Sequence, residues 1–226
     1  MTAVRARRLL TALTSVILQI ALLAAVMIGL GFLTTHVLVH YWPLTIEGEA
    51  VRALDAARTP TLDRVSNLVS LIGYTLGLTT VGVAAGCLMR IAYHRWRWGL
   101  FLVAAMLAQI VVYKLTAWAV DRARPAVPQL DNFPPMRSFP SGHTAAAVVL
   151  YGGIAMVLAM HSRRRAQAVA WWAVLLLIPA AVGISRVYRG MHNPSDVAAS
   201  FLLGLGCLWI LRRAILRPAG RSASPR

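Results

Sequence analysis

Long apolar segments separated by short polar connections make up most of the chain. Six of these segments are long enough to cross a bilayer once, because about 20 helical residues span roughly 30 Å of hydrocarbon. They cover approximately residues 9–40, 67–90, 99–120, 142–160, 168–185 and 196–211. The pattern therefore predicts an all-α fold, a polytopic membrane bundle with six transmembrane helices.

One connection, residues 41–66, is long and mixes charged with apolar residues. Its composition predicts short amphipathic helices on the outer membrane surface, with a break at Thr59-Pro60. We expect this segment to act as a lid or an access helix and to contribute no catalytic group. The whole chain forms a single membrane domain. Its remaining parts outside the membrane are an outer loop and two terminal tails, at 121–141, about 1–8 and 212–226.

The composition agrees with this prediction. Hydrophobic residues make up 58% of the chain and the mean hydropathy is +0.65, which is too apolar for a soluble domain of 226 residues. The apolar run that begins at Leu9 is far longer than the core of a signal peptide, so we interpret it as the first span. Cys87 and Cys207 both lie inside apolar segments, and we expect no disulfide between them.

The net charge of +16 is divided unequally between two sets of connections. The termini and the second and fourth connections carry fourteen arginines and no acidic residue, whereas the other connections carry eight arginines and all seven acidic residues. By the positive-inside rule, both termini are cytoplasmic and the second set of connections is extracytoplasmic. The basic excess thus indicates topology in an inner (plasma) membrane and contact with anionic lipid, and it predicts no nucleic-acid partner.

The connection before the last span carries the densest chemistry. Asn193 is a favourable N-cap and Pro194 a favourable first helical residue, so a helix should begin here with Asp196 at its third position. His192 lies just outside that helix end, where an anion is favoured. A carboxylate one turn away can accept the second N–H of the imidazole and prepare the ring for nucleophilic attack. The alternative is that Asp196 only caps the helix while His192 fills a loop.

Two further polar motifs lie on the same predicted side. Ser141 can cap the helix that follows it, Gly142 lets a ligand approach the first backbone amides, and His143 follows in the same turn. Lys114 lies about two turns before the outer end of the third span, and Arg122 and Arg124 follow that end. A lysine this deep in an apolar helix is a functional candidate, with snorkelling to the surface as the alternative. Cations, helix N-termini and two histidines on one side fit phosphoryl transfer by covalent catalysis.

At these residues the sequence resembles the type 2 phosphatidic acid phosphatase (PAP2) superfamily of lipid phosphate phosphatases. Residues 139–143 (Phe-Pro-Ser-Gly-His) are similar to its second motif. Ser185-Arg186, followed by His192 and Asp196, is similar to its third motif. The six-span layout is also that of the family.

The first motif departs from the family pattern. Residues 122–125 (Arg-Ala-Arg-Pro) resemble its end, but the family's lysine falls at Ala117, and Lys114 stands three residues earlier on the same helix face. Either Lys114 or Arg122 is then expected to fill the role of that lysine.

The resemblance implies a mechanism. His192, oriented by Asp196, attacks phosphorus and forms a phosphohistidine, and His143 protonates the departing lipid oxygen before it activates water. The resemblance further implies that no metal and no cofactor is required. The groups expected to hold the phosphoryl oxygens are Arg124, Arg186, Ser141, Gly142 and Lys114 or Arg122.

Similar bacterial proteins act on undecaprenyl diphosphate, phosphatidylglycerophosphate or phosphatidate. We therefore expect a membrane hydrolase that removes the terminal phosphate of a polyprenyl diphosphate or a glycerolipid phosphate. One alternative is a lipid-dependent phosphotransferase with the same intermediate, and another is a non-catalytic protein that binds or transports lipid head groups. The sequence leaves the preferred lipid and the oligomeric state open.

Overall fold

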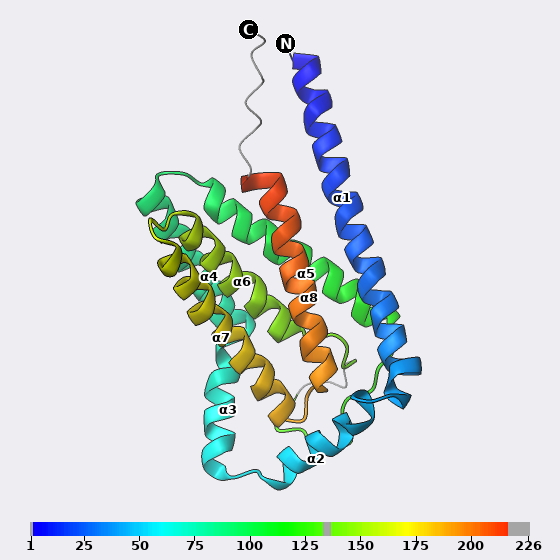
Figure 1. The fold of residues 1–226 in the computed structure, drawn as a ribbon. Helices are drawn as coiled ribbons and strands as arrows, with labels where there is room; N and C mark the ends of the chain where they lie inside the picture. The colour runs from blue at the N-terminus through cyan, green and yellow to red at the C-terminus, as the bar shows by residue number, and fades with distance from the viewer. Residues whose placement is uncertain (1, 133–136, 217–226) are drawn as a thin grey trace.

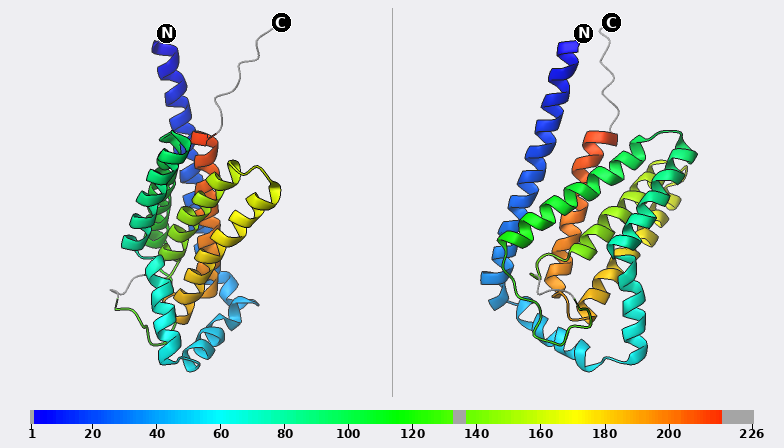
Figure 2. Two further views of the ribbon diagram at one scale, coloured as in Figure 1. Left: turned by 90° about the vertical axis from the view of Figure 1, so that its left-hand side faces the viewer. Right: turned by 180° about the vertical axis from the view of Figure 1, so that it is seen from behind.

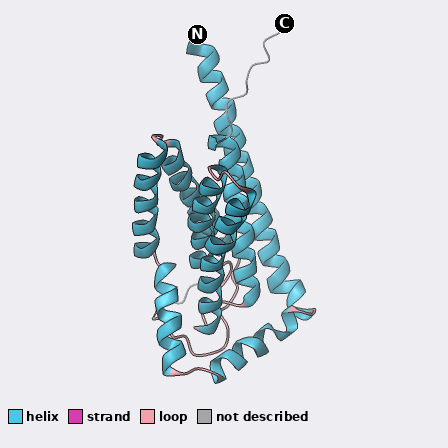
Figure 3. Cartoon of the chain, turned by 60° about the vertical axis from the view of Figure 1, so that its left-hand side comes forward, coloured by secondary structure: helices cyan, strands magenta, loops and turns pink. Residues whose placement is uncertain are grey.

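The computed structural model describes residues 2–132 and 137–216, and every regular element in these ranges is a helix (Figures 1 and 3). The predicted all-α fold is therefore confirmed. The α-helices are α1 Thr2–Phe32, α2 Glu47–Ala56, α3 Pro60–Ile72, α4 Thr75–Tyr93, α5 Arg97–Ala119, α6 Gly142–Met160, α7 Arg165–Tyr188 and α8 Pro194–Leu211. Short π and 3-10 segments lie at Leu33–Val37, Leu38–His40, Leu44–Ile46 and Arg212–Leu216.

Six of the described segments are long and apolar enough to cross a membrane, which confirms the predicted number and order of spans. They are Leu10–His40, Leu76–Tyr93, Arg97–Ala119, Gly142–Met160, Arg165–Tyr188 and Pro194–Leu216. The predicted tail at 212–226 begins with a helical turn, and its residues 217–226 lie outside the described part of the chain.

The predicted second span, 67–90, begins too early. The structure ends α3 at Ile72 and starts α4 at Thr75, so residues 67–72 belong to the interfacial helix. Ser66 and Ser70 are buried on one face of α3, whereas Leu68 and Leu71 are exposed. A hydropathy window cannot detect the break, because the exposed apolar residues of α3 continue directly into the apolar sequence of α4.

Helix α6 is the centre of the bundle, with α5, α7 and α8 packed around it. Small residues allow these close approaches. A Cβ added at Gly153 would lie 2.6 Å from Leu102 on α5, and one added at Gly204 would lie 2.5 Å from Val148. The bundle therefore brings the start of α6 and the start of α8 close together at one end.

Three connections meet at that end of the bundle (Figures 1 and 2). They are the segment with α2 and α3, the loop between α5 and α6, and the short turn between α7 and α8. The predicted interfacial helices are present, and Thr59 caps α3 through a bond from the Leu62 N–H with Pro60 at its first position. The arginine-rich connections lie at the opposite end, together with the start of α1 and the end of α8.

Candidate active site

The turn before α8 presents His192 at a capped helix N-terminus, as the sequence predicts. Asn193 is the N-cap, Pro194 the first helical residue and Asp196 the third. The Asp196 carboxylate reaches back and accepts the backbone N–H of Asn193 at 2.8 Å. The residues around His192 are therefore fixed by the local structure of the helix end.

The partner of the His192 ring differs from the predicted one. Its Nδ1 lies 2.7 Å from the backbone carbonyl oxygen of Ser138 and 3.9 Å from the nearest Asp196 oxygen. A carbonyl only accepts hydrogen bonds, so Nδ1 donates and the lone pair of the neutral ring is on Nε2. The expectation that Asp196 accepts the imidazole N–H is wrong in this geometry, because the capping position directs the carboxylate toward the backbone of the turn.

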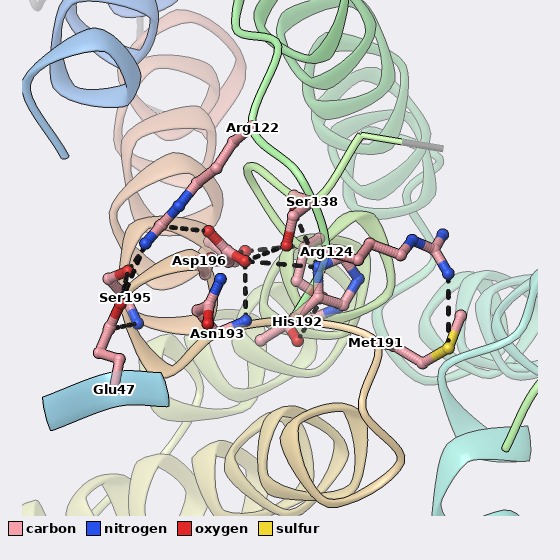
Figure 4. Close-up of polar contacts among 12 residues, drawn as sticks. Glu47, Arg122, Arg124, Ser138, Met191, His192, Asn193, Ser195 and Asp196 are labelled. Carbon is pink, nitrogen blue, oxygen red and sulfur yellow. Dashed lines mark hydrogen bonds and ion pairs between the residues drawn. The ribbon is translucent and has the colours of Figure 1, made fainter. Parts of the chain in front are cut away.

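Asp196 acts on the nucleophile through Ser138 instead. The Ser138 hydroxyl donates to Asp196 Oδ2 in a short hydrogen bond, and the backbone carbonyl of the same serine accepts from His192 (Figure 4). Both Ser138 and Asp196 are fully buried. The carboxylate thus holds the residue that orients the ring.

Arg122 belongs to this network. Its guanidinium donates to Asp196 Oδ1 at 2.7 Å, to Glu47 Oε2 at 3.0 Å and to the Ser195 hydroxyl at 2.7 Å. The predicted role of Arg122 in phosphate binding stays a prediction, and these contacts give the residue a second role at the turn before α8. A guanidinium already paired with two buried carboxylates has little charge to offer a third anion.

Glu47, at the start of α2, completes the network. Its Oε1 accepts the backbone N–H of Ser195 at 2.6 Å, and its Oε2 accepts the Ser195 hydroxyl at 2.9 Å (Figure 4). Glu47 thereby accepts a hydrogen bond from a backbone N–H in the first turn of α8, which has no partner within the helix. The helix dipole favours a negative charge at this end. The segment expected to act as a lid also anchors the turn that carries the nucleophile.

A second network fixes Arg186. Arg186 is 1% exposed, and its Nη1 donates to Asp131 Oδ2 at 2.6 Å and to the Ser70 hydroxyl at 2.7 Å. Arg189 Nε donates to the other oxygen of Asp131 at 2.8 Å. Burial alone would raise the pKa of Asp131, but the hydrogen bonds and charges of these arginines lower it below its usual value. Asp131 is therefore an ionised bridge between the two.

The Nε–H group of Arg186 makes none of these hydrogen bonds. Its Nε is buried and has no hydrogen-bond partner among the described residues. A buried guanidinium N–H without a partner is costly, and an anion bound next to it would remove that cost.

The second motif forms the N-terminus of α6. Ser141 is the N-cap, with its hydroxyl 2.9 Å from that of Thr144, and Gly142 is the first helical residue. A Cβ on Gly142 would lie 2.9 Å from the Tyr113 ring, so a larger residue there would have to displace that ring. The ring of His143 meets Tyr74 edge-on, with centroids 4.9 Å apart.

The starts of α6 and α8 are tied directly to each other. The Ser200 hydroxyl contacts the backbone carbonyls of Ser141 at 2.9 Å and Asp196 at 2.7 Å, and Ser141 N–H donates to the Asp196 carbonyl at 3.3 Å. Two helix N-termini therefore point toward one region.

The pKa of His192 responds to the charged groups that lie near it. Burial, followed by the charge of Arg186, lowers the pKa of His192 well below its usual 6.5, and Arg124 and His143 add to the effect. Burial, followed by the charge of Arg186, also lowers the pKa of Arg124. The structure thus brings His192, His143, Arg124 and Arg186 into one cluster. Arg124 Nη1 donates to Gln129 Oε1 at 3.1 Å and contacts Met191 Sδ at 3.4 Å, and Figure 4 draws the contact with Met191.

Lys114 lies apart from these arginines. Its side chain is exposed and lines an apolar groove beside Gly142 and His143. The structure therefore places it beside the start of α6, in the same groove as His143.

Comparisons with known proteins identify the family. The sequence profile described as "PAP2 superfamily" matches residues 98–218, more than half of the chain. The chain belongs to the PAP2 superfamily. It is a multi-pass membrane phosphatase of this family, the enzyme class that the sequence predicts.

Individual members of the superfamily resemble the chain over different lengths. It is 29% identical to phosphatidylglycerophosphatase B of Bacillus subtilis over 81% of this chain and 90% of that protein. It is 32% identical to an undecaprenyl-diphosphatase of Sulfolobus acidocaldarius over 47% of this chain and 50% of the relative.

Solved structures confirm the membrane fold. The transmembrane PAP2-type phosphatidylglycerolphosphate phosphatase of Bacillus subtilis superposes with a TM-score of 0.69 at 27% identity, over 88% of this chain and 94% of that one. LpxE of Aquifex aeolicus superposes with a TM-score of 0.59 at 28% identity, over 73% and 93%.

Three residues that position the site in this PAP2 protein were not predicted: Glu47, Asp131 and Ser138. Their networks join segments far apart in sequence, which no local pattern reports. Ser138 directly precedes the second motif, and Asp131 is an acidic residue in a loop that also carries arginines, so each offered a weak signal. Glu47 offered no signal in the sequence apart from its position at the start of a helix.

Proposed function

We propose that this PAP2 protein removes the terminal phosphate of a lipid phosphate or diphosphate through a phosphohistidine at His192. The supporting observation is the unpartnered, buried Nε of Arg186 beside a histidine whose Nδ1 is already bonded to Ser138. A hydrogen-bond donor for an anion and an imidazole lone pair close to each other are the two things that attack on a phosphoryl group requires.

The proposed first step is attack on phosphorus. A bond forms between His192 Nε2 and phosphorus, the bond from phosphorus to the lipid oxygen breaks, and His143 gives that oxygen a proton. In the second step, His143 takes a proton from water, the water oxygen attacks phosphorus, and inorganic phosphate leaves His192. No metal ion is needed for either step.

The cationic cluster would stabilise the negative charge of the phosphoryl group during transfer. Arg124 and Arg186 would hold its oxygens, together with the Gly142 amide at the first turn of α6 and, as predicted from the sequence, the Ser141 hydroxyl. Asp196 would act as a positioning residue through Ser138. These groups are fixed before substrate arrives, so little reorganisation is needed during the reaction.

The site would face the extracytoplasmic side of an inner membrane. This placement rests on the arginine distribution, since the opposite end of the bundle carries the arginine-rich connections. The names of the relatives favour phosphatidylglycerophosphate or undecaprenyl diphosphate as lipid.

The decisive experiment compares wild-type enzyme with His192→Ala in detergent, with candidate lipid phosphates and no acceptor other than water. We expect phosphate release by the wild type and a loss on the order of 10³-fold or more in the variant, which still folds. Rapid quenching with ³²P-labelled lipid should detect alkali-stable, acid-labile phosphate on the wild-type protein alone. Transfer of the phosphoryl group to an added alcohol, with no inorganic phosphate released in its absence, would favour the phosphotransferase. Unchanged function in His192→Ala would favour a binding or transport protein.

A further inference from the structure

A groove of about 300 Å³ opens beside His143. Helices α4, α5 and α6 form its walls. Its apolar lining includes Leu78, Met106, Ile110 and Ala146. A lipid tail is the part of a membrane substrate that fits such walls.

The groove is also lined by a positively charged side chain, close to the first turn of α6. Lys114 lines it together with Gly142 and His143, and no ion pair of Lys114 is present among the described residues. The neighbouring Tyr113 ring lies against Gly142, which places this part of α5 level with the first turn of α6. Lys114 is therefore in the same groove as His143, at the level of the first turn of α6.

A buried polar group without a hydrogen-bond partner in the described part of the chain also lines this groove. Gln109 is 2% exposed, and its Oε1 is buried with no hydrogen-bond partner among the described residues. It precedes Lys114 by five residues, about 7.5 Å along the helix axis. A purely hydrocarbon ligand would leave this amide oxygen unpaired, because it accepts hydrogen bonds and needs a ligand that carries a hydroxyl or another donor.

We propose that the groove binds the lipid-side half of a substrate with two phosphate groups. This inference rests on the proposed function, because the terminal phosphate must lie against His192, Arg124 and Arg186. The second, inner phosphate then contacts Lys114, and the lipid linkage continues past Gln109. When the terminal phosphorus–oxygen bond breaks, the leaving group keeps the inner phosphate, whose negative charge Lys114 stabilises.

The test compares two lipids that differ only in the inner phosphate: a dioleoylglycerol diphosphate and the corresponding monophosphate, in mixed micelles. Lys114→Ala should lower kcat/KM for the diphosphate by about 10-fold or more, as expected for the loss of a charge-assisted contact, and for the monophosphate by less than about 3-fold. Equal losses on both lipids, or no loss on either, would overturn the inference. So would a wild type that prefers the monophosphate.

Three matched variants separate the explanations. Lys114→Arg keeps the charge and should retain the preference for the diphosphate. Ile110→Ala removes apolar contact from the same groove and should lower both rates to a similar extent; a selective loss there would mean that groove shape, not charge, sets the preference. His192→Ala tests the proposed chemistry separately, since it should abolish release from both lipids.

Discussion

The two sides of the reaction site are built in opposite ways. On the His192 side, the polar groups of Asp196, Arg122 and Glu47 are paired with one another and with the turn before α8. On the His143 side, Lys114 is exposed and Gln109 is buried without a partner for its Oε1 among the described residues. The paired side holds one arrangement of the nucleophile, while the open side leaves groups available to a substrate.

This difference separates two tasks. A nucleophile gains most from groups that are fixed in advance, because reorganisation during the reaction costs rate. Substrate recognition needs groups whose hydrogen bonds are completed only when the lipid arrives. Variants on the paired side should therefore change kcat with every lipid, and variants on the open side should change the choice between lipids.

The largest effect on the paired side is expected for Asp196→Ala. This change leaves Arg122, Ser138 and the Asn193 amide without their shared acceptor, so kcat should fall by about 100-fold or more. Phosphate release at saturating lipid measures it. Asp196→Asn should lose less, because the amide oxygen can still accept from Ser138 and the contact with His192 is indirect. An equal loss in the two variants would indicate that the carboxylate acts directly on the imidazole.

A smaller effect is expected for Glu47→Gln. The amide removes one of two carboxylates from Arg122 and places a donor where Ser195 or Arg122 needs an acceptor. We expect kcat to fall by about 10-fold with KM nearly unchanged, as for a residue that positions the nucleophile.

The matched control for this variant is Glu49→Gln, on the same helix two residues further on. Glu49 is exposed, so this change should leave kcat within about 2-fold of wild type. In the double variant Glu47→Gln/Arg122→Gln, the two effects should be less than additive, because both residues act through one network. Full additivity would argue against a shared path to His192.

The smallest effect concerns pH. Burial and then Arg186 lower the pKa of His192, so the ring stays neutral and nucleophilic at pH values where a free histidine is protonated. As pH falls, activity should therefore be lost only below 6.5. The profile of kcat/KM between pH 4.5 and 8, corrected for ionisation of the lipid phosphate, measures this shift. An acid limb at or above pH 6.5 that follows the enzyme and not the lipid would contradict it.

Much of the architecture follows from local sequence. Apolar segments of sufficient length fixed the number and order of the spans, and Asn193-Pro194 and Ser141-Gly142 marked the starts of α8 and α6. The break between α3 and α4 was missed because hydropathy continues across Gly73. The gathering of His143, Arg124, Arg186 and His192 could be anticipated, because alternating spans place their loops at the same end.

What the sequence by itself determined is which segments cross the membrane, where the helices of the site begin, and which titratable groups share one end of the bundle. These properties depend on composition and on contacts within a turn or two. Only the tertiary structure decided that Ser138 binds His192, that Arg122 pairs with Asp196 and Glu47, and that Lys114 lines a groove. Those pairings join segments more than 50 residues apart, and they depend on how the helices pack and turn their faces toward one another.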